Sequence, residues 1–175
     1  MQPTAANDTA SVTGTLKQTE FPAGTLVIGI GNNLLGDDGA GIHAIERLRG
    51  KQLPDHVDLV DGGTLSFTLL EQVENAEYLI IVDAAELDAD PGTVRVFMND
   101  EMDAFLATSR RPSVHEVNLL DVLTAARLRR RMPARYAMVG IQPLNVEWSS
   151  TPSEPVDQAV DQAVEIIAEL IGEGA

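Results

Sequence analysis

Cysteine is absent from this chain of 175 residues. Its absence excludes a cysteine nucleophile, a thiolate metal site and disulfide bonds. Aromatic residues make up only 4% of the sequence, so a hydrophobic core must be built from aliphatic side chains. No segment is apolar over the length of a membrane span, and the N-terminal region lacks the basic patch and apolar run of a signal peptide. We therefore expect a cytoplasmic protein that does not enter a membrane.

Positive charge is also scarce. Twelve Lys and Arg residues face 27 Asp and Glu residues, which gives a formal net charge of -15. Such a surface repels nucleic acid and anionic membranes, so neither is expected as a partner. The hydrophobic content of 44% is ordinary for a globular protein, and the length of the chain fits one domain with a substantial core.

Strand-like and helix-like segments alternate along the sequence. Short apolar runs predict strands at residues 25–31, 57–61, 78–82, 93–98 and 136–141. Helical spacing predicts helices at residues 39–49, 65–73, 99–107 and 114–130, and from Pro155 onwards. This alternation is typical of a single-domain α/β fold, with a twisted, mostly parallel sheet of about five strands and helices on both faces. Residues 1–22 are polar and aperiodic, so we expect a disordered tail there and the α/β domain over residues 23–175.

Acidic residues follow three of the predicted strands. Asp37 and Asp38 lie in the glycine-rich loop after the first strand, Asp61 ends the second and Asp83 follows the third. In an open α/β sheet, ligands bind at the carboxyl ends of the strands, so these carboxylates are candidate site residues. The competing interpretation of Asp37 is a helix cap. A carboxylate after the very apolar third strand is costly without a partner, which favours a functional role for Asp83.

A histidine could join these acids. His115 follows Ser113, and Ser113 and Glu116 have the spacing of a capping box that would fix the first turn of a helix. Two carboxylates and an imidazole would form an open site for a divalent transition metal, although such a set is not specific for one metal. The alternative for His115 is an ordinary surface position, which is also our expectation for His43 and His56.

Two further patterns in the sequence bear on its function. Gly29 and Gly31 begin like a dinucleotide-binding fingerprint, but Leu34 occupies the position of the third glycine, and the paired acids would repel a pyrophosphate. A nucleotide-binding protein is therefore a weaker hypothesis. The only basic cluster comprises Arg127, Arg129, Arg130, Arg131 and Arg135. We interpret it as favourable charge at a helix C-terminus, with a docking patch for an acidic partner as the alternative.

Taken together, the motifs resemble those of the [NiFe]-hydrogenase maturation endopeptidases, in particular the hydrogenase-3-type branch. The loop sequence GIGNNLLGDDGAG is similar to the first motif of that family. The motifs that follow in the same order are DGGT at 61–64, IIVDA at 80–84, SVHEVNLLDVL at 113–123 and VGIQP at 139–143. The resemblance covers about residues 25 to 172 and implies the same α/β fold.

The resemblance also implies a function. Members of that family remove a short C-terminal extension from the hydrogenase large-subunit precursor after nickel insertion, and the precursor carries the nickel. The nickel-contacting positions of the family fall on Asp38, Asp83 and His115, with Asp37 as a supporting or capping residue. Whether Asp38 and Asp83 act as metal ligands or one of them acts as a general base stays open. The family implies a monomer, and a non-catalytic chaperone for a metallated precursor is the alternative function.

Overall fold

The computed structural model describes residues 24–64, 67–108 and 114–172. Its strands are β1 Thr25–Ile30, β2 Val57–Gly63, β3 Tyr78–Ala84, β4 Val94–Met98 and β5 Arg135–Ile141. They form one five-stranded sheet in the order β2-β1-β3-β5-β4. All neighbouring strands pair in parallel except β4, which runs antiparallel to β5 at one edge. The predicted single-domain α/β fold with a mostly parallel sheet is confirmed, whereas the predicted tail lies outside the described residues.

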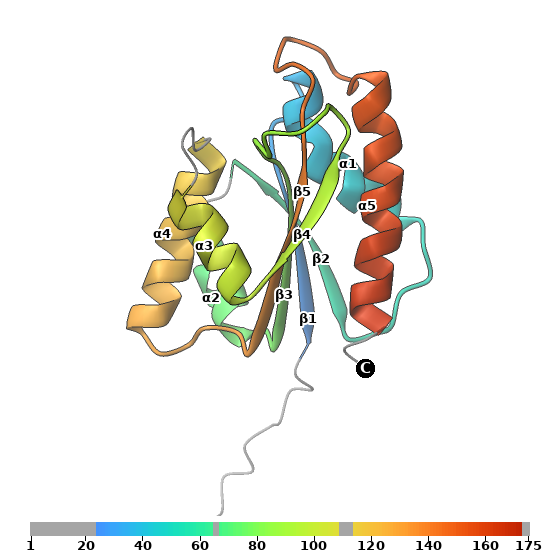
Figure 1. Cartoon of the computed structure of the whole chain (residues 1–175). Helices are drawn as coiled ribbons and strands as arrows, with labels where there is room; N and C mark the ends of the chain where they lie inside the picture. The colour runs from blue at the N-terminus through green and yellow to red at the C-terminus, as the bar shows by residue number, and fades with distance from the viewer. Residues whose placement is uncertain (1–23, 65–66, 109–113, 173–175) are drawn as a thin grey trace, which may run out of the picture.

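Helices cover both faces of this sheet (Figure 1). The α-helices are α1 Ala40–Arg49, α2 Leu70–Asn75, α3 Asp100–Thr108, α4 Val114–Leu128 and α5 Glu154–Gly172. Two short 3-10 helices, η1 Gly36–Gly39 and η2 Phe67–Leu69, precede α1 and α2. Helices α1 and α5 pack on one face, and α2, α3 and α4 lie on the other (Figure 1). None of these helices is both long and apolar enough to cross a lipid bilayer.

The central strands are apolar along their whole length because they are covered on both faces. Every residue of β1 and β3 is buried. Alternate side chains of β3 enter different cores: Ile80 and Val82 pack against α1 and α5, whereas Leu79 and Ile81 pack towards α4. The two cores are almost entirely aliphatic, as the low aromatic content requires.

The glycines after β1 are explained by close packing of backbone on backbone. A Cβ atom on Gly41 would lie 2.3 Å from the carbonyl oxygens of both Ile30 and Val82. A Cβ atom on Gly29 would lie 2.2 Å from the carbonyl oxygen of Gly41. The first turn of α1 therefore rests directly on β1 and β3. Close packing accounts for these glycines without a bound phosphate, and it brings the loop after β1 next to the end of β3.

Candidate active site

Three of the predicted site residues meet at the carboxyl edge of the sheet. Asp83 lies near the end of β3, Asp38 in η1 after β1, and His115 in the first turn of α4. The imidazole lies between the two carboxylates. Its Nδ1 is 3.6 Å from Oδ1 of Asp83, and its Nε2 is 3.7 Å from Oδ2 of Asp38. The predicted convergence of these residues is therefore observed, because η1, the end of β3 and the start of α4 meet at the same point.

Asp83 is the most deeply buried member of this group, with no exposed surface. Neither of its carboxylate oxygens accepts a hydrogen bond of ordinary geometry from the described residues. Burial raises the pKa of Asp83, and the nearby Asp38 raises it further, while the interactions with His115 and with the backbone of Ala84 oppose this shift. A buried carboxylate with so few partners is costly in its charged form. The position therefore favours either a bound proton or an added cation.

Asp38 lies on the accessible side of the group. Its side chain is 15% exposed, compared with 0% for Asp83 and 7% for His115. The backbone N–H of Asn32 donates to Oδ2 of Asp38 at 3.2 Å, which holds the carboxylate in the loop. A substrate or metal would therefore meet Asp38 first and Asp83 last.

Asp37 points into a different environment. It is fully buried, and its carboxylate accepts hydrogen bonds from the backbone N–H groups of Leu144, Asn145 and Ser153 and from the Ser153 hydroxyl. Burial alone would raise the pKa of Asp37, but these hydrogen bonds together lower it below its usual value. Asp37 makes no capping hydrogen bond to η1 or α1, so the capping interpretation is wrong for its own helices. It supports the site by anchoring the loop between β5 and α5.

Asp61 does not join the site. It is exposed at the end of β2, and its Oδ1 accepts a hydrogen bond from the N–H of Gly63 in the same turn. The expectation that all the strand-end acids converge is therefore wrong for Asp61, because its side chain satisfies its own turn. The capping box predicted from Ser113 and Glu116 lies outside what the structure describes.

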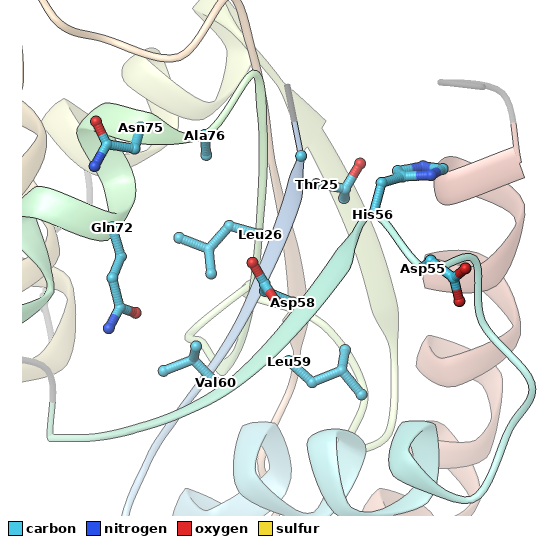
Figure 2. A pocket seen from close by; sticks show the side chains of 11 residues that line it. Thr25, Leu26, Asp55, His56, Asp58, Leu59, Val60, Gln72, Asn75 and Ala76 are labelled. Carbon is cyan, nitrogen blue, oxygen red and sulfur yellow. The ribbon is translucent and has the colours of Figure 1, made fainter. Parts of the chain in front are cut away.

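The other two histidines lie away from the site. His43 on α1 is only 17% exposed, with Nδ1 3.4 Å from Glu46, so it is more covered than predicted. His56 is half-buried and lines a hollow of about 820 Å³ at the amino end of β1 and β2 (Figure 2). Asp58 of β2 and Gln72 of α2 line the same hollow. This hollow lies at the opposite end of the strands from Asp38 and Asp83.

Four of the five arginines in the basic cluster make side-chain contacts within the chain. Its paired members are Arg127 with Asp103, Arg129 and Arg131 with Glu74, and Arg135 with the ring of Tyr78. These partners favour a structural role over a docking patch for an acidic protein.

One buried polar residue was missed from the sequence. Gln142, directly after β5, is 5% exposed, and its Oε1 accepts a hydrogen bond from the N–H of Leu87 at 2.7 Å. It fixes the loop after β3, which begins beside Asp83. The only sequence signal was its position in the VGIQP motif, because its partner lies 55 residues away.

The side chains of Asp38, Asp83 and His115 have the chemistry to bind a divalent metal. Their arrangement is not that of a preformed metal site. Two carboxylates and one imidazole suit a transition metal. Within the described part of the chain, however, no three acidic or histidine side chains are arranged to hold an ion. The imidazole nitrogens of His115 face the two carboxylates instead. A metal that bound these three residues would have to displace these contacts.

Several solved structures have the same fold as this chain. The hydrogenase maturating endopeptidase HybD from Escherichia coli matches with a TM-score of 0.81 and 32% identity, over 87% of this chain and 94% of that one. The [NiFe] hydrogenase maturation protease HybD from Thermococcus kodakarensis matches with a TM-score of 0.73 and 28% identity, over 85% and 99% of the two chains. A hydrogenase 3 maturation protease, at a TM-score of 0.64 and 22% identity, supports the fold alone.

Sequence comparison gives the same group of proteins. The hydrogenase expression/formation protein HupD of Bradyrhizobium diazoefficiens is 36% identical over 133 residues, which cover 75% of this chain and 69% of that protein. For HupD of Rhodobacter capsulatus, the identity is 38% and the alignment covers 72% of this chain but only 60% of that protein. The hydrogenase 2 maturation protease of Escherichia coli is 36% identical, over 70% and 74% of the two chains.

A family model described as HycI: Hydrogenase maturation protease matches residues 42–170. This match covers most of the α/β domain and includes Asp83 and His115. It agrees with the resemblance inferred from the order of the motifs, and we conclude that the chain belongs to the hydrogenase maturation protease family.

Proposed function

We propose that this protein is an endopeptidase that removes the C-terminal extension of a [NiFe]-hydrogenase large-subunit precursor, and that it uses nickel carried by the precursor. The observation that best supports this proposal is the position of His115 between Asp38 and Asp83, with both ring nitrogens less than 4 Å from a carboxylate. The proposal includes a cytoplasmic location and a monomeric enzyme.

The burial gradient suggests how a metallated substrate would be recognised. Asp38 is the accessible carboxylate, and Asp83 is the buried one without an ordinary hydrogen bond. A divalent cation that reaches Asp83 would compensate its negative charge where water cannot. Binding of the metal-free precursor would leave that carboxyl uncompensated. The site would therefore discriminate in favour of the precursor that already holds its metal.

Three protein ligands would leave coordination positions free for groups of the substrate. The metal could then polarise the scissile carbonyl, or it could hold the peptide in place while a carboxylate acts as general base. Burial raises the pKa of Asp83 above its ordinary value, which makes it a stronger base than an exposed aspartate. Both routes require Asp83 and His115 at the reacting centre.

The test is processing of a nickel-loaded precursor, followed by mass spectrometry of the shortened large subunit. We expect His115→Ala and Asp83→Asn to slow cleavage by about 10²- to 10⁴-fold, as is usual when an acid–base or metal-contacting group is lost. Asp58→Asn is the matched control, because Asp58 is an exposed carboxylate of β2 that lies towards the amino end of the strand, away from the site. It should process at the wild-type rate.

Two outcomes would contradict the proposal. Equal processing by wild type and both site variants would remove these residues from the reaction. Stable binding of the nickel-loaded precursor with no shortened product would instead favour a chaperone. The metal-free precursor serves as a further control and should remain uncut.

A further inference from the structure

Four exposed apolar side chains lie on the loops that follow β1 and β5. Leu34, Leu144, Val146 and Trp148 are all more than half exposed, and Trp148 is 82% exposed. We call these four residues the apolar rim. Large exposed side chains gathered in one region often mark an interaction surface.

The rim belongs to two loops that are joined by hydrogen bonds. The N–H of Ser149 donates to the carbonyl oxygen of Leu34 at 3.1 Å, and the N–H of Gly36 donates to the carbonyl oxygen of Ser149 at 2.8 Å. The carboxylate of Asp37 also accepts hydrogen bonds from the backbone N–H groups of Leu144 and Asn145. The rim is therefore held in place before any partner binds, which lowers the entropic cost of binding.

The same loops lead directly to the reacting groups. Leu34 donates its N–H to Oδ1 of Asn32, and Asn32 donates its N–H to Oδ2 of Asp38. In Figure 1 the loop between β5 and α5 arches over the end of the sheet where α1 begins. A protein that delivers a peptide to Asp38 would therefore contact the rim.

The charge of the loops around the apolar rim indicates which kind of partner could bind there. The loops 31–39, 61–64, 84–92 and 142–153 contain no Lys or Arg. They contain the acidic residues Asp37, Asp38, Asp61, Glu86, Asp88, Asp90 and Glu147. Arg110 and Arg111 fall in a segment outside the described residues. A second copy of this chain would bring like charges together at the rim, and an anionic membrane would be repelled.

We propose that the apolar rim is the docking surface for the folded body of the large-subunit precursor, which meets it with an apolar patch flanked by basic residues. This inference rests on the proposed function. Trp148 would be the main anchor, because tryptophan residues at the centre of an interface commonly contribute much of the binding free energy. Docking through the rim would place the C-terminal extension at Asp38 without requiring tight binding by the extension itself.

The test separates KM from kcat for cleavage of the nickel-loaded precursor. Trp148→Ser should raise KM by about tenfold or more with kcat nearly unchanged, because it removes a contact made before the reaction. Leu128→Ser is the matched control, since Leu128 is also 82% exposed but lies at the end of α4. It should leave both constants unchanged. Thermal melting of each variant checks that the fold is intact.

A second pair of variants tests the charge. Glu147→Lys should raise KM by about threefold to tenfold at low salt and by less at high salt, because it repels a basic partner. Glu169→Lys on α5 makes the same charge change at another exposed position and should have no effect.

The possible outcomes are distinct. If Trp148→Ser cleaves with wild-type KM, the docking inference is wrong, although cleavage by the wild type still supports the proposed function. A fall in kcat at constant KM would also contradict it, because the rim would then act on the reaction and not on docking. If the wild type cleaves no precursor, the proposed function fails and the docking inference fails with it.

Discussion

Carboxylates are buried at both ends of the sheet, and their partners differ. At the amino end, the side chain of Glu74 is only 2% exposed, and Oε1 lies 2.9 Å from Nε of Arg129 while Arg131 approaches Oε2 at 3.7 Å. At the carboxyl end, Asp83 has only the imidazole of His115 within ion-pair distance among the described residues. An arginine is always charged, whereas a histidine changes its charge near neutral pH. Glu74 thus has two charged partners, whereas Asp83 has a single imidazole.

Asp37 shows that the carboxyl end can also satisfy a buried acid completely. Its four hydrogen bonds come from the loop between β5 and α5, and they lower its pKa despite burial. Neighbouring acids in one loop therefore have opposite roles. Asp37 is fixed in its ionised form by the protein, whereas Asp38 keeps part of its surface open to solvent. The buried carboxylates of Asp37 and Asp83 thus differ in their partners more than in their burial.

The largest effect on stability is expected from Asp37→Ala. It would leave several buried N–H groups without an acceptor and release the loop that carries Trp148, so we expect a loss of about 3 kcal/mol in the free energy of unfolding. Urea denaturation measures this loss, with Asp90→Ala as the control at an exposed position. Equal stability of the two variants would show that Asp37 does not anchor the loop.

A smaller loss is expected from Glu74→Gln. The variant removes a nearly buried charge from two arginines that are themselves more than half exposed, so solvent screens part of the interaction. We expect a loss of about 1–2 kcal/mol in urea denaturation and no change in precursor cleavage. Glu71→Gln, at an exposed position of the same helix, should change neither. Impaired cleavage by Glu74→Gln would contradict the assignment of a purely structural role to the buried carboxylate at the amino end of the sheet.

Asp83→Asn should change stability in the opposite direction. Because the charged form of Asp83 is costly to bury with few partners, the neutral amide should raise the free energy of unfolding at neutral pH by about 1 kcal/mol. Cleavage would be lost in the same variant, which is the expected conflict between stability and activity at a reacting group. Asp58→Asn, at an exposed position of β2, is the control and should be neutral. A loss of stability in Asp83→Asn would mean that the folded protein compensates the charge of Asp83 well.

The smallest effect is a dependence on pH. Since burial raises the pKa of Asp83 above the ordinary value of 3.8, the folded chain holds a proton that the unfolded chain has already released. The contribution of Asp83 to stability therefore falls as pH rises from about 3.8 to the raised folded value. The advantage of Asp83→Asn over wild type should grow across this window. A constant difference between the two proteins across this range would argue against the raised pKa.

The sequence predicted the strands and helices because the apolar runs and periodic segments are long and separated by glycine-rich turns. It also predicted the meeting of Asp38 and Asp83, because parallel strands end at one edge. It could not predict the partners of Asp37, which lie 107 to 116 residues further along the chain. The sequence also could not distinguish Asp61 from the other acids. The hydrogen bond that Asp61 accepts from Gly63 cannot be inferred from the spacing of the strands.

Trp148 is the only tryptophan of the chain, and 82% of it is exposed. The protein therefore has a single indole fluorophore, located beside the groups that we expect to carry out the reaction. Its emission should resemble that of indole in water when the protein is alone and shift to shorter wavelength when a partner covers it. Association of the unmodified protein with a partner that lacks tryptophan could thus be followed in real time without any added label.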